Sequence, residues 1–586
     1  MSSQAQSLVR EGMERQQAGD LEGARARYQD ALDLDPDNAD ALHLSGLVAL
    51  QSGAAEEAAK LIRKAVDRAP DHPVLRSNLG LALHRAGTLV AAAGQLQKAL
   101  ELREDYAGAH MNLGAVFSDL GDREAALEHG LRAVELEPER AEAWFNLGLF
   151  LLDRVELPQA VEAFRRALQI RPAYPAAATS LLYTLHLTPG MEPDDVAAEH
   201  RRVSDAVYGA PPPRPDPRQR PPGSPLCIGY LSADFRRHAV SHFFEPLLEA
   251  HDRGRFRVAC YSDTADTDAM TDRLMGLADL WCDARGLDDA DLAERIRRDG
   301  VDVLVDLAGH TKGNRLGVLA RRPAALQLGW LGYPAHPGLA ALDGQIVDTQ
   351  TAQPVLDTAA GQDLVPMTAP FAVFRPAPNA PAPAPPPVQE RGFVTLGALH
   401  KLEKVNADVV ACWAEILKAL PEARLLLVRD HLDAWQRRRL LGQFDACGIG
   451  AERLELMPGK PEGGSFHEFW ADIDLFLDTF PWSGHTMACH ALWCGVPVVT
   501  LAGRAHASRL VAGVLQALGR DAWVAERETD YVARVVELAG DPDALGDARD
   551  SLRARFEASS LRDEQGFARR FEALLLEQYD RVTGRA

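Results

Sequence analysis

A period of 34 residues runs through the first third of the chain and limits what that part can fold into. Glycines recur at this interval in two series, and alanines and prolines keep step with them. The first series is Gly12, Gly46, Gly80, Gly114 and Gly148. Small residues at fixed places let two antiparallel helices approach closely, and a proline ends the second helix of each pair. The pattern predicts five helix pairs over residues 3–172, with a further first helix from Tyr174 to His186.

This spacing resembles the tetratricopeptide repeat, so we expect residues 1–186 to form an α-solenoid. Arrays of this kind bind an extended peptide or another protein in a concave groove. A spacer or dimerisation arm without a ligand explains the repeats equally well.

Two proline-rich runs, at residues 211–225 and 376–387, mark boundaries in the rest of the chain. Around them, short apolar segments alternate with helical ones, which predicts parallel sheets in two Rossmann-like, doubly wound domains. The predicted strands are residues 226–232, 256–262, 301–309 and 325–332 before the second proline-rich run, and 392–398, 423–430, 454–459, 475–480 and 496–503 after it. Ligands of such domains bind at the carboxyl ends of the strands. The predicted divisions are repeats (1–186), helix and linker (187–225), a first lobe (226–375), a linker (376–390), a second lobe (391–545) and C-terminal helices (546–586).

Charge and cysteine content exclude several functional classes. A net charge of −21 and a pI near 5.3 argue against a nucleic-acid or anionic-membrane binder, which needs a basic surface. Seven scattered cysteines without a C-x-x-C pair argue against disulfide and zinc-ribbon frameworks. Neither a signal peptide nor an apolar run of about 18 residues is visible, so a reduced, cytoplasmic location is expected.

No recognisable cofactor motif is present. G-x-G-x-x-G does not follow a strand, and the P-loop pattern is absent. Two D-x-D pairs, which end at Asp268 and Asp474, fit helix capping or chance better than metal binding. We therefore predict no cofactor and no metal.

Four segments place chemically useful residues at predicted strand ends. His238 and His242 flank a turn after the strand at 226–232, where a histidine can act as a general base near neutral pH. A surface or capping histidine is the alternative. Lys312 and Lys401 each follow a strand, in a chain with only eight lysines. This scarcity argues weakly against Lys312 being generic surface charge, and at Lys401 a cation could meet a diphosphate.

The fourth segment, DTFPWSGHT, runs from a strand end at Asp478 into a helix that opens at His485 and Thr486. Free backbone N–H groups at such a helix start favour a phosphate. Plain N-capping is the alternative role of Ser483 and Thr486.

These four segments follow the repeats along the chain. In this order, they resemble the O-GlcNAc transferase/SPINDLY family of GT-B glycosyltransferases. The matching motifs are DFRRHAVSH, GHTKGNR, RPAALQLGWLGYP, DTFPWSGHT and LWCGVPVVTL. The resemblance implies an inverting, metal-independent protein O-glycosyltransferase. It would transfer a sugar, GlcNAc from UDP-GlcNAc, to Ser or Thr of a protein acceptor that the tetratricopeptide groove recruits. The sequence does not decide whether the protein forms a homo-oligomer.

The resemblance also implies roles for individual residues. It assigns His238 as the base, Lys401 as the cation that neutralises the leaving diphosphate, and Lys312 as a residue that shapes the active site. It assigns nucleotide-sugar binding to His467, Ser483, Gly484, His485, Thr486 and His490.

The chain departs from the family pattern at four places. Met487 replaces a second threonine, and His490 stands where an acidic residue commonly binds the ribose. The other two places are dipeptides: Gly397–Ala398 replaces Asn–Gln, and His336–Pro337 replaces Thr–Ser. These departures leave two alternatives: a transferase for another nucleotide sugar, or a repeat scaffold that binds partner proteins and has lost turnover.

Overall fold

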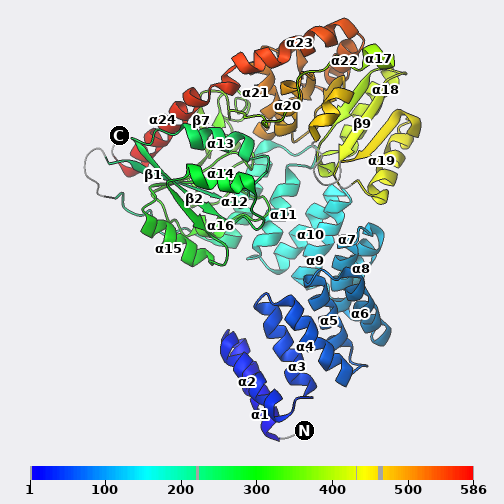
Figure 1. The fold of residues 1–586 in the computed structure, drawn as a ribbon, viewed down its shortest axis with the longest axis vertical. Coiled ribbons are helices and arrows are strands. Elements are labelled where there is room, and N and C mark those ends of the chain that lie inside the picture. Colours follow the sequence, from blue (N-terminus) through cyan, green and yellow to red (C-terminus); the bar gives the residue numbers. More distant parts are fainter. Residues whose placement is uncertain (1–2, 219–223, 431, 460–465, 585–586) are drawn as a thin grey trace. The chain divides into compact units, whose positions relative to one another are not determined.

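The 34-residue period forms consecutive helix pairs in the computed structural model, which describes residues 3–218, 224–430, 432–459 and 466–584 (Figure 1). The chain divides into two compact units, residues 1–171 and 172–586. The helices of the first unit are α1 (Ser3–Gln17), α2 (Leu21–Leu34), α3 (Ala39–Gln51), α4 (Ala55–Arg68), α5 (Pro73–Arg85), α6 (Leu89–Leu102), α7 (Ala107–Asp119), α8 (Arg123–Leu136), α9 (Ala141–Asp153) and α10 (Leu157–Ile170). The predicted helical repeats are therefore confirmed.

Both glycine series have a steric cause. A Cβ atom at Gly80 would lie 2.5 Å from Leu96 Cγ of the paired helix, so only glycine permits this approach. The second series occupies the turns within pairs, where Gly87 has φ +75°, a conformation that side chains disfavour. Val155 takes the equivalent turn with φ +60°.

The second unit holds two sheets, and every strand pair in them is parallel. Their orders are β3-β2-β1-β4-β5-β6-β7 and β10-β9-β8-β11-β12-β13. The first sheet comprises β1 (Leu226–Ser232), β2 (Phe256–Ser262), β3 (Leu280–Asp283), β4 (Val303–Asp306), β5 (Leu326–Gly329), β6 (Gly344–Asp348) and β7 (Leu364–Met367). The second comprises β8 (Thr395–Ala398), β9 (Arg424–Arg429), β10 (Leu454–Pro458), β11 (Leu475–Leu477), β12 (Val498–Leu501) and β13 (Val524–Ala525).

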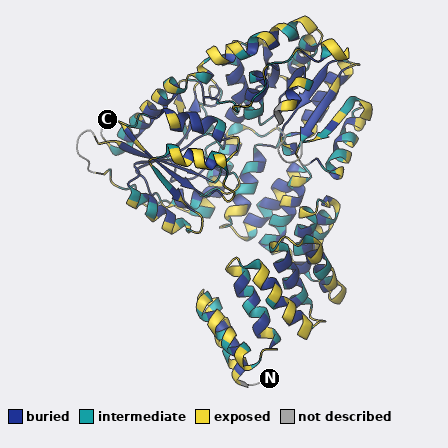
Figure 2. Cartoon of the chain, viewed as in Figure 1, coloured by how far each residue is buried: buried dark blue, intermediate teal, exposed yellow. Residues whose placement is uncertain are grey.

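Helices cover the sheets, whose central strands are buried (Figure 2). Around the first sheet lie α13 (Ser241–Ala250), α14 (Ala269–Leu277), α15 (Asp289–Asp299) and α16 (Leu316–Ala320). The later helices are α17 (Val388–Arg391), α18 (Ala407–Ala419), α19 (Ala434–Ala446), α20 (His485–Trp493), α21 (Leu510–Ala517), α22 (Glu528–Ala539), α23 (Pro542–Ala558) and α24 (Glu564–Thr583). Among the described residues, every helix is too short or too polar to span a bilayer.

Two helices precede the first sheet within the second unit, α11 (Pro175–Leu185) and α12 (Pro193–Tyr208). The Tyr333 hydroxyl lies 3.1 Å from the carbonyl oxygen of Leu182 in α11 and 2.6 Å from His200 Nε2 in α12. These contacts hold both helices against the turn after β5. The 34-residue period predicts a further repeat helix at residues 174–186, and the corresponding helix α11 lies in the compact unit that holds the sheets.

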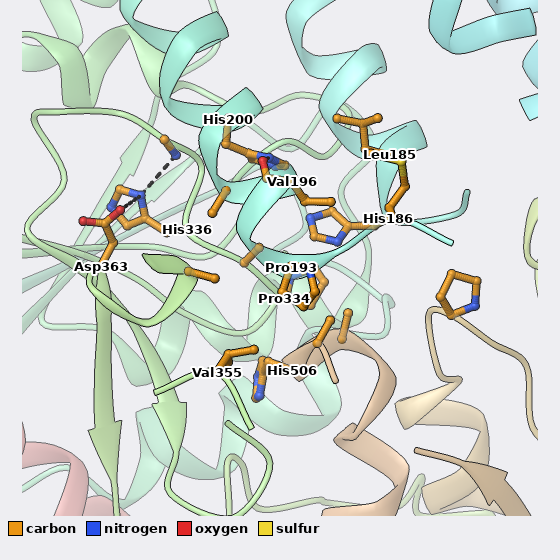
Figure 3. A pocket seen from close by; sticks show the side chains of 18 of the residues that line it. Leu185, His186, Pro193, Val196, His200, Pro334, His336, Val355, Asp363 and His506 are labelled. Atoms are coloured by element: carbon orange, nitrogen blue, oxygen red, sulfur yellow. Dashed lines mark hydrogen bonds and ion pairs between the residues drawn. The ribbon is translucent and has the colours of Figure 1, made fainter. Parts of the chain in front are cut away.

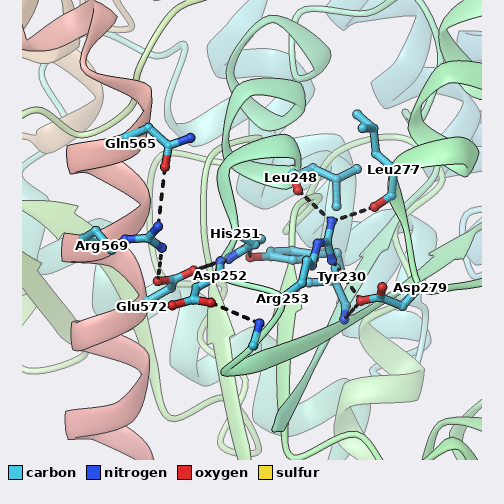
Figure 4. A network of polar contacts seen from close by, with 12 residues as sticks. Tyr230, Leu248, His251, Asp252, Arg253, Leu277, Asp279, Gln565, Arg569 and Glu572 are labelled. Carbon is cyan, nitrogen blue, oxygen red and sulfur yellow. Dashed lines mark hydrogen bonds and ion pairs between the residues drawn. The ribbon is translucent and has the colours of Figure 1, made fainter.

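The C-terminal helix α24 returns to the first sheet through a buried polar network (Figure 4). Glu572 Oε1 accepts hydrogen bonds from His251 Nδ1 at 3.0 Å and from the Asp252 backbone N–H at 2.8 Å. The other ring nitrogen of His251 lies 2.7 Å from the Tyr230 hydroxyl in β1. The network joins segments more than 300 residues apart in sequence.

Replacing Glu572 by glutamine is expected to lower the melting temperature, because the change weakens a buried hydrogen-bonded pair at a cost of about 2–4 kcal/mol. Burial lowers the pKa of His251 despite its hydrogen bond to Glu572. His251 therefore binds a proton at a higher pH in the unfolded chain than in the folded chain. Its protonation lowers the free energy of unfolding as the pH falls below 6.5. Melting curves at neutral and acid pH test both statements. Glu577→Gln, an exposed change on the same helix, is the control and should leave the curve in place.

Candidate active site

The predicted site residues follow the strands at the centre of each sheet. His238 comes after β1, Lys312 after β4, Lys401 after β8, and the turn that ends at His485 after β11. In each sheet the strand order reverses between these two neighbours, β1 with β4 and β8 with β11. Ligands of open parallel sheets bind at the carboxyl ends of strands at such switch points.

His238 lies in the loop between β1 and α13. Its Nδ1 is 3.7 Å from Asp234 Oδ2, its backbone N–H donates to Ser241 Oγ at 3.2 Å, and its side chain is 38% exposed. Burial lowers its pKa although Asp234 acts in the opposite direction, and the nearby charge of Lys401 lowers it further. A neutral imidazole that is partly open to solvent can accept a proton.

Lys312 lies in the turn after β4, and its side chain is exposed. The next residue, Gly313, has φ +79°, and a Cβ atom there would lie 2.8 Å from Ala233 Cβ. The turn therefore packs against the loop that carries His238. The structure places Lys312 beside this loop without a described contact to His238.

The start of α20 is fixed by a buried carboxylate. Asp478 Oδ1 accepts from the Gly484 backbone N–H at 2.7 Å, and Oδ2 accepts from Thr500 Oγ1 at 2.7 Å. Burial raises the pKa of Asp478 to about 6. The turn is thereby held so that α20 begins at His485, and the N–H groups of a first helical turn have no acceptor within their own helix. Such groups and the helix dipole attract a phosphate.

Other side chains of this turn have packing roles as well. Ser483 Oγ donates to the Ala507 carbonyl at 2.8 Å. The His485 ring stacks on Phe243 of α13 with centroids 4.7 Å apart, and burial lowers its pKa to about 3. Thr486 is partly buried in the first turn of α20. The α20 start therefore packs directly against the helix that follows the His238 loop.

Two lysines lie close to this helix start, in different environments. Lys401 is 58% exposed, and its Nζ is 3.8 Å from Glu403 Oε1. Lys404, in the short 3-10 helix η2 (Leu402–Lys404), donates from Nζ to the Ser483 carbonyl at 3.0 Å. Its Nζ also lies 4.6 Å from the centre of the Trp482 ring. Burial lowers the pKa of Lys404 to about 8, with Asp478 acting in the opposite direction.

The sequence pattern selects Lys401 and does not single out Lys404, although Lys404 is the lysine that contacts the turn before α20. The available signal was the scarcity of lysine, because two of only eight lysines stand three residues apart in this segment. Which of Lys401 and Lys404 is the more buried depends on the backbone path through η2, and the local sequence pattern does not specify that path.

The two remaining predicted residues differ in how far the structure places them. His490 is buried in α20, with its ring 4.7 Å from that of His242 and 5.0 Å from that of Phe374. It therefore lies between the two lobes near the His238 loop. The side chain of His467, in η4 (Phe466–Asp472), lies outside the described part of the structure.

A separate cavity of about 80 Å³ lies between α11, α12, the turn after β5 and residues 505–507 (Figure 3). Its walls include His186, His200, His336 and His506, whose pKa values burial lowers. None of the nine predicted site residues lines it. The polar and charged groups at the strand ends form the candidate site.

The described residues contain no cluster of three or more His, Cys, Asp or Glu side chains arranged to hold a metal ion. The acidic pairs noted in the sequence have structural partners. Asp268 caps α14, and Asp474 accepts hydrogen bonds from the backbone of Val388 and Thr395.

Comparison with known protein families identifies the family to which this architecture belongs. Residues 206–373 and 392–571, together more than half of the chain, match glycosyl transferase family 41. The chain belongs to glycosyl transferase family 41. Tetratricopeptide repeat models match residues 9–73 and 111–175 of this family 41 protein.

The similar curated proteins are plant SPINDLY proteins, described as probable UDP-N-acetylglucosamine–peptide N-acetylglucosaminyltransferases. The protein of Solanum lycopersicum is 36% identical over 358 residues, and that of Arabidopsis thaliana 36% over 352 residues. These alignments cover 60% and 59% of the family 41 chain but 38% of each relative. The chain thus spans well under half the length of the curated relatives it matches.

Among solved structures, a lysine-to-methionine mutant of the Thermobaculum terrenum O-GlcNAc transferase is similar over most of both chains. It is 32% identical with a TM-score of 0.78, covering 88% of this chain and 98% of that one. This likeness confirms the predicted fold: helical repeats followed by two parallel α/β sheets in a GT-B arrangement.

Proposed function

We propose that this family 41 protein transfers a sugar from a nucleoside diphosphate sugar to a Ser or Thr hydroxyl of a protein. UDP-GlcNAc is the donor to test first, because the similar curated proteins are described as using UDP-N-acetylglucosamine on peptides. In this proposal the tetratricopeptide repeats recruit the acceptor protein.

The observation that carries the proposal is the pairing of Lys404 with the start of α20. The lysine Nζ lies 3.0 Å from the carbonyl of Ser483, two residues before the helix begins. A departing nucleoside diphosphate gains negative charge, which a partly buried cation and a helix N-terminus stabilise. Lys401, the lysine selected from the sequence, lies more exposed beside Glu403 and adds positive charge next to this position.

His238 supplies the proton acceptor in the proposed reaction. The acceptor oxygen forms a bond to the anomeric carbon as the bond from that carbon to the diphosphate oxygen breaks, which inverts the anomeric configuration. The hydroxyl proton passes to the neutral imidazole of His238, and the diphosphate leaves as an anion beside Lys404. The turn that carries Lys312 supports the His238 loop through the contact of Gly313 with Ala233.

The pH dependence of transfer should follow His238. Its pKa lies below 6.5, so the acid limb of kcat/KM is expected below that pH. Asp234 raises this pKa, and Asp234→Asn should therefore move the acid limb to lower pH without abolishing transfer. Rate profiles of wild type and variant between pH 4.5 and 8 measure the shift. An unchanged acid limb would assign it to another group.

The proposal is tested with purified protein, candidate sugar nucleotides and a peptide or lysate acceptor. We expect a donor-dependent rise in melting temperature and a mass increase of one sugar on Ser or Thr. If no donor raises the melting temperature and none is transferred or hydrolysed, the chain is a repeat scaffold instead of an enzyme.

The environment of His490 is the reason to test other donors too. This histidine is packed against His242 and Phe374 at the position where the family commonly has an acidic residue for the ribose. Imidazole offers a single acceptor or donor at each nitrogen, unlike the two oxygens of a carboxylate. A parallel series with UDP-glucose and GDP-fucose would show whether the nucleoside or sugar preference has changed.

A further inference from the structure

Tyr183 of α11 reaches the segment that carries the two lysines. Its hydroxyl donates to Glu403 Oε1 at 3.2 Å. Its ring lies 5.3 Å from that of Trp482, and Lys401 Nζ is 6.0 Å from the ring centre. A helix that precedes both sheets in sequence therefore contacts the lysine segment and the turn before α20.

Glu403 stands between the two lysines in the sequence, forms an ion pair with Lys401, and acts on the adjacent Lys404 through its charge. Its Oε1 is 3.8 Å from Lys401 Nζ, and its charge raises the pKa of Lys404 against the effect of burial. The carboxylate is 29% exposed, so solvent screens it only in part. The only hydrogen bond that the described residues show to this carboxylate comes from Tyr183.

Several other charged or titratable groups face Lys404. Asp478 favours its protonated form, whereas the neighbouring charge of Lys401 opposes it. His400 and His485 also lie within electrostatic reach, but burial lowers the pKa of each to about 3, so both are neutral at working pH. Glu403 and Asp478 are therefore the two acidic groups that balance a pair of adjacent cations.

We propose that Tyr183 is a positioning residue, which holds the Glu403 carboxylate beside Lys401 and within electrostatic reach of Lys404, and so favours a protonated Lys404 for the diphosphate of the donor. This inference rests on the proposed function, because it concerns the same diphosphate position. Tyr183 need not touch the donor, since it acts through Glu403. Its hydroxyl stays protonated and available as a donor, because burial and Glu403 raise its pKa.

The test is the pH dependence of UDP-GlcNAc binding, measured by calorimetry on the full chain between pH 6.5 and 8.5. Wild-type affinity should fall toward pH 8.5 as Lys404, with a pKa of about 8, loses its proton. In Tyr183→Phe and in Glu403→Gln, the loss of affinity between pH 6.5 and pH 8.5 should be larger than in the wild type by about threefold or more. The reason is that losing a fixed anion lowers the pKa of the nearby Lys404 ammonium. At pH 6.5, where Lys404 is protonated in all three proteins, the affinities should agree within about threefold.

Tyr208→Phe on α12 is the matched control, and its profile should follow the wild type. Profiles of both site variants parallel to the wild type would overturn the inference while leaving the proposed function intact. A uniform loss of affinity at all pH values would likewise overturn it, because it would indicate a merely structural role for Tyr183. If UDP-GlcNAc does not bind, the same titration is run with UDP-glucose and GDP-fucose, and failure of the wild-type protein to bind any of the three at any pH would refute the diphosphate site and the inference with it.

Discussion

Replacing Lys404 by methionine is expected to reduce sugar transfer by about 10²–10³-fold, with a smaller effect on the fold than on the rate. Methionine keeps the length of the side chain but removes the ammonium group that contacts the Ser483 carbonyl. The charge developing on the leaving diphosphate would then be stabilised only by the α20 start and the more exposed Lys401. Because this interaction strengthens as the bond breaks, kcat should fall more than donor affinity.

The chain offers a matched control three residues away. Lys401→Met removes the same charge from a side chain that is 58% exposed, and transfer should fall by no more than about tenfold, since solvent screens an exposed charge. Steady-state kinetics and melting curves of both variants decide which of the two lysines stabilises the leaving diphosphate. If Lys401→Met abolishes transfer and Lys404→Met does not, the original assignment of Lys401 is correct and the buried lysine is structural.

Much of the architecture could be predicted because the helix pairs and several strands have regular sequence patterns. The 34-residue period indicated the helix pairs, and the apolar segments at 226–232 and 256–262 coincide with β1 and β2. Strands β3, β6, β7 and β13 were not identified. They are short, and β7 contains Pro366 at the edge of its sheet, a position where proline is tolerated but the local pattern no longer reads as a strand.

The site was predictable by segment and less so by residue. Within the second sheet, the ends of the neighbouring strands β8 and β11 bring Lys401 and the His485 turn to one edge, as parallel topology requires. The position of His238 relative to them depends on how the two sheets pack, which the strand pattern does not specify. The contributions of Lys404 and Asp478 depend on burial, and burial is set by contacts with Trp482 and Thr500 from other segments. Such long-range contacts leave no trace in the spacing of nearby residues.

Gly484→Ala should reduce donor affinity by at least about tenfold, because its Cβ would disturb the helix start that we assign to the diphosphate. A Cβ atom at this position would lie 2.3 Å from His400 Cε1 and 2.4 Å from His400 Nδ1. The imidazole cannot move away freely, since it is buried and its Nε2 lies 2.8 Å from the Leu477 carbonyl. The turn must therefore shift, which weakens the hydrogen bond from the Gly484 N–H to Asp478.

Gly442→Ala in α19 separates this steric effect from the general effect of a glycine substitution. A Cβ atom at Gly442 meets nothing within 4 Å, and alanine in a helix interior is favoured by about 0.5–1 kcal/mol. This control should bind UDP-GlcNAc as the wild type does and melt at the same or a higher temperature. Unchanged donor binding in Gly484→Ala would mean that the diphosphate does not depend on the α20 start. The positive charge of Lys404 alone would then have to account for donor recognition, and the role assigned to Ser483, Gly484, His485 and Thr486 would be withdrawn.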